Sequence, residues 1–204
     1  MTKLIVEGAP LLHEESRAKR LKALTCEQHA QLDSALSQAD TFASVEAYGR
    51  FLVMQLQFHR AVDALYRHPR LQALIPQLVE RRRLPLVALD LSDLGLSAPP
   101  PVQPPVFAEA APIEVATALG WLYVAEGSNL GASLLRKQVA KIGLSDDFGA
   151  RHLAPAREGP AEQWRRFVEA LDAAPLSVVD DARAGAGARE AFALVRSLAD
   201  RHIF

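Results

Sequence analysis

The stretch PIEVATALGWLYVAEGSNLGASLLRKQVAKIG, residues 112–143, decides the fold. It is the most apolar part of the chain, and no segment of useful length within it alternates with a period of two. It therefore predicts one long helix over residues 113–142. Lys137 and Lys141 suit the negative end of the dipole of such a helix, and Gly143 suits the position where it ends.

Three of the 11 glycines in the chain, Gly120, Gly127 and Gly131, lie inside this predicted helix. Each costs a helix about 1 kcal/mol relative to alanine. At about 100° per residue, Gly127 and Gly131 lie about 20° to either side of Gly120, so all three share one stripe. A stripe without Cβ atoms lets another body approach the backbone. That body is either a second helix, the commoner use of small residues, or a flat ligand.

The rest of the chain also has helical periodicity, with apolar residues recurring at three- and four-residue steps. The predicted helical segments are 14–38, 44–68, 70–95 (a short helix and then a second one near Pro85), 160–172 and 177–202. Residues 97–112 hold six of the 13 prolines, a density that favours an extended loop over a helix. We expect an all-α bundle of about seven or eight helices, with 97–112 as a surface loop inside a single domain, 1–204.

Composition excludes several classes of protein. The chain has 204 residues, a net charge of −1 and a pI of about 6.6, so it lacks the overall basic field of a nucleic-acid-binding protein. Its one cysteine, Cys26, rules out an internal disulfide framework. No apolar run approaches the roughly 18 residues of a membrane helix, and residues 1–12 lack a secretory apolar region. We expect a cytoplasmic protein with no nucleic-acid or membrane partner.

Six histidines are candidate ligands for a metal: His13, His29, His59, His68, His152 and His202. His29 stands out because it shares a helix face with Thr25, Leu32 and Leu36. Cys26 and His29 have the spacing of two zinc ligands, but a structural zinc site needs four ligands and no second cysteine exists. Cys26 is expected to be a small packing residue. His59 is expected to be a packed or rim histidine.

Four segments of the sequence resemble bacterial haem oxygenases in the same order along the chain. They are LTCEQHAQLD at 24–33, FASVEAYGRFL at 42–52, GWLYVAEGSNLGASLL at 120–135 and FGARHL at 148–153. Residues 1–12 and the proline-rich loop fall outside the resemblance, which otherwise covers most of the chain. It implies a single helical domain that clamps haem between a proximal and a distal helix.

The resemblance also implies roles for particular residues. His29 occupies the position of the proximal iron ligand. Lys22 and Tyr123 occupy positions that hold the haem propionates in members releasing the α isomer of biliverdin. Lys22 precedes His29 by two turns on the same face, although spacing alone favours a solvated lysine in a charge-rich helix. In the run Arg81–Arg83, otherwise read as a solvated helix face, the resemblance places Arg83 near the haem edge.

On the distal side, the resemblance implies that Gly127 and Gly131 bring the helix backbone against the porphyrin. A side chain at either position should obstruct the pocket, whereas Gly120 should tolerate alanine better. Ser128 stands where animal-type members carry an aspartate that organises water, so an ionised relay residue is missing there. Arg136 and Lys137 are expected on a positive rim that receives an electron donor.

The implied function is O2- and electron-dependent cleavage of haem at the α-meso carbon to biliverdin IXα, Fe²⁺ and CO. Haem would be both substrate and cofactor, with the protein supplying orientation. Electrons would come from an external ferredoxin, flavodoxin or reductase, because no dinucleotide-binding glycine motif is found. A non-catalytic haem or bilin carrier on the same fold and an unrelated helical adaptor are the alternatives. Whether a bilin-accepting photoreceptor takes the product stays open.

Overall fold

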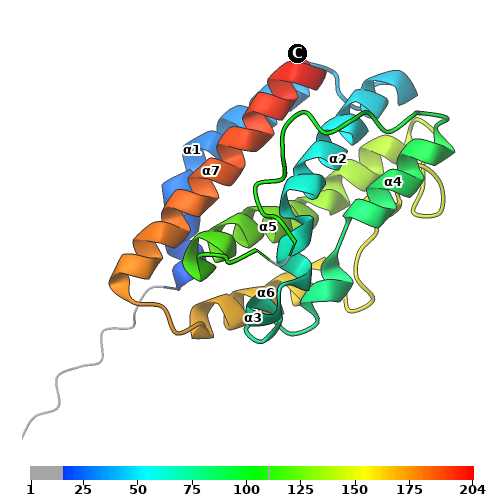
Figure 1. Ribbon diagram of the computed structural model, residues 1–204. Helices are drawn as coiled ribbons and strands as arrows, with labels where there is room; N and C mark the ends of the chain where they lie inside the picture. The colour runs from blue at the N-terminus through cyan, green and yellow to red at the C-terminus, as the bar shows by residue number, and fades with distance from the viewer. Residues whose placement is uncertain (1–15, 110) are drawn as a thin grey trace, which may run out of the picture.

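The computed structural model describes residues 16–109 and 111–204, and these residues are mostly helical (Figure 1). The helices are α1 (Arg17–Gln38), α2 (Val45–Arg67), α3 (Pro69–Gln72), η1 (Leu78–Arg81), α4 (Leu84–Asp93), α5 (Val115–Ala140), η2 (Arg151–Leu153), α6 (Pro160–Ala173) and α7 (Val178–His202). The described part of the chain contains no strand. This confirms the prediction of an all-α fold. The predicted N-terminal extension, 1–12, lies outside the described residues.

Local signals in the sequence explain where the helices begin and end. The Ser44 side chain accepts a hydrogen bond from the Ala47 N–H and begins α2. That helix ends at His68, whose backbone is extended because Pro69 follows it. Ser177 and Asp180 form a reciprocal capping box at the start of α7.

The long helices α1 and α7 lie side by side, and α7 also packs extensively on α5 (Figure 1). The α5–α7 contact depends on two glycines. A Cβ atom at Gly120 would lie 2.0 Å from the Ala184 carbonyl oxygen, and one at Gly187 would lie 2.3 Å from the Thr117 carbonyl oxygen. The expectation that Gly120 tolerates alanine is therefore wrong. Gly120 serves close helix packing, the alternative that the sequence left open, because the backbone of α7 occupies the space beside it.

The proline-rich segment crosses α2 and is held there by polar contacts. Gln57 Nε2 donates to the Pro100 carbonyl at 2.9 Å, and Arg60 Nη1 donates to the Pro99 carbonyl at 2.6 Å. Elements on both sides of this segment pack together, because α7 contacts both α1 and α2. The loop is thus fastened to the surface of the helices that precede it.

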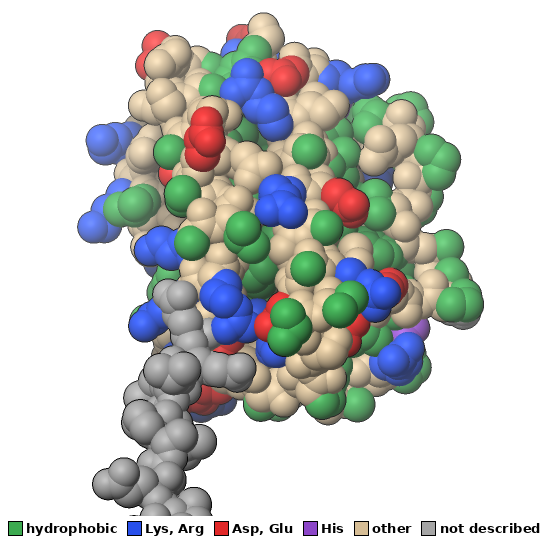
Figure 2. Space-filling model, turned by 90° about the vertical axis from the view of Figure 1, so that its left-hand side faces the viewer, with side chains coloured by type: hydrophobic (Ala, Val, Ile, Leu, Met, Phe, Trp, Pro, Cys, Tyr) green, Lys and Arg blue, Asp and Glu red, His purple; other side chains and the backbone are tan. Residues whose placement is uncertain are grey.

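The surface on the side of α1 and α7 is chemically mixed (Figure 2). Lys and Arg side chains are spread over it among single hydrophobic side chains, with acidic ones between them. Across residues 16–109 and 111–204, none of the helices has the length and apolar character needed to cross a membrane.

Candidate functional site

His29 lies on an exposed face of α1, and 64% of its side chain is accessible to solvent. Its Nδ1 lies 3.0 Å from Asp33 Oδ2, one turn further along the helix. The ring edge contacts Phe192 of α7, with the ring centroids 6.0 Å apart. Nε2 makes no hydrogen bond to a described residue. The imidazole is therefore oriented by a carboxylate on one side and has a nitrogen available for a ligand on the other.

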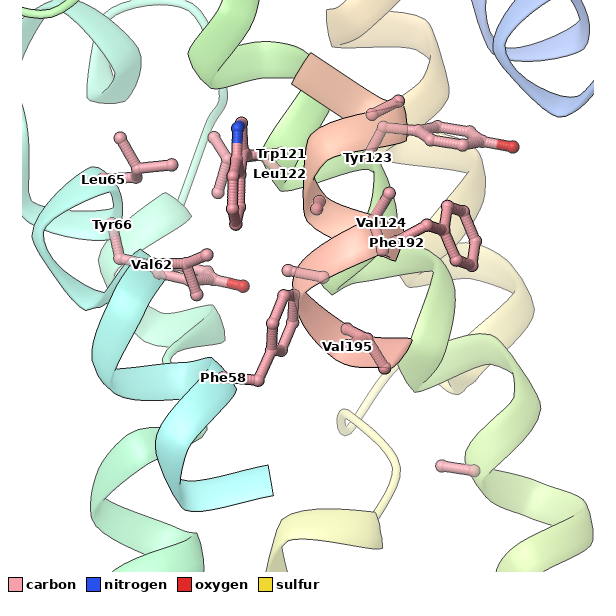
Figure 3. Packing of buried hydrophobic residues seen from close by; sticks show 14 of the residues in the cluster. Phe58, Val62, Leu65, Tyr66, Trp121, Leu122, Tyr123, Val124, Phe192 and Val195 are labelled. Carbon is pink, nitrogen blue, oxygen red and sulfur yellow. The ribbon is translucent and has the colours of Figure 1, made fainter. Parts of the chain in front are cut away.

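Tyr123 of α5 meets the same face of α1. The Thr25 hydroxyl on that face donates to the Leu21 carbonyl at 2.8 Å, and burial raises the pKa of the Tyr123 phenol, while the nearby Thr25 side chain lowers it by a smaller amount. In Figure 3, Tyr123 and Phe192 point to the same side, away from the α2 residues Phe58 and Val62. Thr25 lies between the exposed Lys22 and His29 on α1. The structure thus brings three of the predicted residues, Lys22, His29 and Tyr123, to one region.

Beyond Glu126, α5 is more exposed, although Ala132 and Val139 are still buried. Gly131 is exposed, and a Cβ atom there would meet no heavy atom within 4 Å. A Cβ atom at Gly127 would meet only the Trp164 ring, at 3.7 Å. The Ser128 hydroxyl donates to the Ala125 carbonyl at 2.7 Å, so its proton is used inside the helix. Gly127 and Gly131 therefore leave a stretch of helix backbone open to approach, unlike Gly120.

Exposed leucines lie on both helices, Leu24 on α1 near Gly185 of α7 and two others on the open stretch of α5. Leu24 on α1 and Leu130 and Leu134 on α5 are each at least 40% exposed, and Leu134 reaches 65%. Large apolar side chains at this exposure, next to glycines and an available imidazole, favour a ligand with a wide apolar surface.

Trp164 of α6 lies beside these residues, although nothing in the predicted helical segment 160–172 pointed to it. Its ring lies 5.7 Å from that of Tyr123 and stacks on Phe167 at 5.5 Å. Its ring is also the nearest group to the position that a Cβ atom on Gly127 would take. No local signal could have shown this, because α6 begins more than 30 residues after Gly127 along the chain.

The basic run Arg81–Arg83 is not a solvated helix face. Arg81 is 5% exposed and forms an ion pair with Glu126 of α5, whereas Arg82 pairs with Asp63 of α2 at 2.9 Å. Arg83 is buried and donates to the Ala154 carbonyl at 3.0 Å. Tertiary packing overrides the charge pattern, since each guanidinium finds its partners on a segment far away in sequence.

Two buried histidines, His59 and His152, lie near Arg83. Burial lowers the pKa of His59 to about 3, with His152 and Arg83 adding to the effect. His152 Nδ1 lies 2.8 Å from Asp90 Oδ2, yet burial still lowers its pKa. Both side chains are held inside the fold, and the low pKa of His59 keeps that ring neutral at pH 7. His59 is therefore packed, as one of its two expected roles had it.

Cys26 does not pack in the core: it is exposed, and its thiol lies 3.3 Å from the Ala23 carbonyl oxygen. No group of three or more His, Cys, Asp or Glu side chains among the described residues could hold a metal ion. On the expected rim, Arg136 forms an ion pair with Asp146, whereas Lys137 is exposed.

Comparison with known proteins places this geometry in a family. The family model described as heme oxygenase matches residues 15–201. The chain is 39% identical over 185 residues to heme oxygenase PigA from Pseudomonas aeruginosa, covering 91% of this chain and 92% of that protein. It is 36% identical over 113 residues to a heme oxygenase from Xanthomonas campestris, covering 55% and 64% of the two chains.

A solved structure agrees with the sequence relatives. The NO- and CO-bound heme oxygenase from Neisseria meningitidis superimposes with a TM-score of 0.83 and 41% identity, over 92% of each chain. The family model and this relative both span almost the whole chain, from α1 to α7. The chain therefore belongs to the heme oxygenase family, enzymes that act on haem with O2 and a reductant.

Proposed function

We propose that this enzyme binds haem between α1 and α5, with His29 Nε2 on the iron, and opens it at the α-meso carbon to release biliverdin IXα, Fe²⁺ and CO. One observation carries the proposal. An available imidazole on α1 and an open glycine backbone on α5 lie in two helices that contact each other. These residues fit a porphyrin, which needs one axial nitrogen and flat, close walls.

The proximal side is prepared by Asp33. A carboxylate on Nδ1 holds that nitrogen protonated and directs the lone pair of Nε2 outward, which sets the tautomer that binds iron. Phe192 contacts the ring edge and limits its rotation. Haem, when bound, supplies the iron chemistry that activates O2.

On the distal side, the α5 backbone orients the flat ligand and excludes larger molecules from the space above it. Gly127 and Gly131 let the α5 backbone come close to the flat ligand, which leaves room for O2 and a few water molecules. The Ser128 hydroxyl is bonded to Ala125 and so donates no proton to the pocket in this arrangement. Protons then reach the site through water and backbone groups, as the missing aspartate implies.

Lys22 and Tyr123 set the in-plane orientation of haem in this proposal. Lys22 is exposed on the His29 face of α1, about 10 Å along the axis, where its ammonium group can bind a propionate carboxylate. Tyr123 offers a hydroxyl beside Thr25 on the same face. Propionates held at this end by the two side chains would fix which edge of haem faces the open glycine backbone. Electrons come from a separate ferredoxin, flavodoxin or reductase.

Hemin titration of the purified chain tests the proposal. We expect a stoichiometric complex with a sharp Soret band, loss of that band in His29→Ala, and its retention in His68→Ala, a matched change at the end of α2. Adding ascorbate or a reductase system should yield biliverdin, identified by chromatography as mainly the IXα isomer. A stable complex that never turns over would leave only a carrier, and absence of stoichiometric binding would exclude both.

A further inference from the structure

The buried side chains of Arg81 and Glu126 join the distal segment to the rest of the fold. Glu126 is 3% exposed and is the last residue of α5 before the open glycine stretch. Both of its carboxylate oxygens are used: the Tyr66 hydroxyl donates to Oε1 at 3.0 Å, and Arg81 Nη1 donates to Oε2 at 2.9 Å. Tyr66 and Arg81 belong to α2 and η1, so three elements meet at this carboxylate.

The same nitrogen of Arg81 has a second acceptor. Nη1 lies 3.2 Å from the carbonyl oxygen of Gln163 on α6. A guanidinium Nη carries two hydrogens, so one atom can serve both acceptors. Glu126 immediately precedes Gly127, and Gln163 immediately precedes Trp164. Arg81 therefore binds the residues that directly precede Gly127 and Trp164.

We propose that Arg81 is a positioning residue that sets the separation of Gly127 from Trp164, and so decides how much of the distal backbone haem can reach. The ring of Trp164 lies 3.7 Å from where a Gly127 Cβ would be, in ordinary van der Waals contact. A small shift of α6 toward α5 would cover this backbone, and a shift away would widen the pocket. The inference rests on the proposed function for its link to haem.

The buried Arg81–Glu126 pair is better explained by the arrangement that it fixes than by the stability that it adds. Charged groups lose their hydration on burial, and a buried ion pair gives little net stability compared with apolar residues of similar volume. Lysine would keep the charge and could also donate to two acceptors, but its ammonium group rotates freely, whereas the planar guanidinium fixes the directions of the two N–H bonds of Nη1. The pair is thus suited to specifying an arrangement.

The experiment compares Arg81→Met/Glu126→Leu with Arg82→Met. The double variant removes both buried charges together and leaves no unpaired ion. Arg82→Met is the matched control, because it also removes an arginine–carboxylate pair, the one with Asp63, but touches neither α5 nor α6. Both are made in a Trp121→Phe background, so that Trp164 is the only tryptophan.

The first readout needs no haem. We expect acrylamide to quench the Trp164 fluorescence of the double variant with a changed constant, whereas Arg82→Met matches its parent. In the haem-loaded enzyme, kcat should fall by up to about 100-fold for a displacement near 1 Å, with a changed isomer ratio of the product. A purely structural role would lower the unfolding temperature and leave the kcat of the folded enzyme and the isomer ratio as they were.

The outcomes separate the two proposals. Unchanged quenching and unchanged isomer ratio in the double variant would refute the positioning role, whatever the enzyme does with haem. If the parent protein fails to bind hemin, the proposed function falls, and the quenching data alone decide whether Arg81 sets the spacing. Should the double variant fail to fold, Arg81→Lys provides the same comparison, with restored wild-type behaviour counting against the proposal.

Discussion

Alanine at Gly120 and at Gly131 should change stability in opposite directions, although the two glycines lie on the same helix. In Gly120→Ala, the new Cβ would lie 2.0 Å from the Ala184 carbonyl oxygen and 2.8 Å from the Ala188 nitrogen. Ordinary contacts need about 3.5–4.0 Å, so α5 and α7 must separate by more than 1 Å. Both obstacles are backbone atoms, and no change of rotamer relieves them.

The magnitude follows from two opposing terms. Overpacking a tight interface costs about 1–3 kcal/mol, and a double backbone clash belongs at the upper end. Alanine returns about 1 kcal/mol through its better helix propensity. We expect a net destabilisation of about 2 kcal/mol, which lowers the unfolding temperature of a chain this size by about 4–8 °C.

Gly131→Ala gains the propensity term without the clash, because nothing lies within 4 Å of its Cβ position. The haem-free protein should be stabilised by about 0.5–1 kcal/mol, raising the unfolding temperature by about 1–4 °C. The added methyl group would stand where the proposed ligand approaches, so hemin affinity should fall.

Thermal unfolding followed by circular dichroism, with hemin titration at a temperature where both variants are folded, measures both effects. Gly120→Ala should bind hemin with near-parental affinity once folded, whereas Gly131→Ala should not. The reasoning fails if Gly120→Ala unfolds at or above the parental temperature, or if Gly131→Ala binds hemin as tightly as the parent.

Two further predictions concern regiochemistry and pH. The double change Lys22→Asn/Tyr123→Phe should loosen the selectivity for the IXα product, as chromatography of the biliverdin isomers would show; an unaltered single isomer would argue against propionate binding by these residues. The pKa of His59, lowered to about 3 in the folded state, lies below its unfolded value. Keeping His59 neutral in the folded state therefore has no cost above about pH 6.5. As the pH falls from there toward 3, the free energy of unfolding decreases by about 1.4 kcal/mol per pH unit. Urea unfolding at about pH 6.5 and 5.5 should show this loss in the parent and a smaller one in His59→Leu; equal losses would contradict it.

The helices and the residues of the proposed haem site were predictable because their signals are local. Caps, prolines and three- to four-residue periodicity act within a few residues, and α2 and α7 begin within one residue of the predicted segments 44–68 and 177–202. His29 and Lys22 lie on one helix, so their common face follows from helical geometry. The family resemblance rests on contiguous motifs and could likewise be read from the chain.

What the sequence by itself determined is therefore the all-α class, the long glycine-containing helix and the family of enzymes. Only the tertiary structure decided which body each glycine meets: the backbone of α7 at Gly120, and open space at Gly131. It also decided that Arg81 pairs with Glu126, 45 residues away, and that the Trp164 ring lies beside Gly127. The physical reason is that burial and partners depend on how elements distant in sequence pack, and helical phase gives the direction of a residue but not its neighbour.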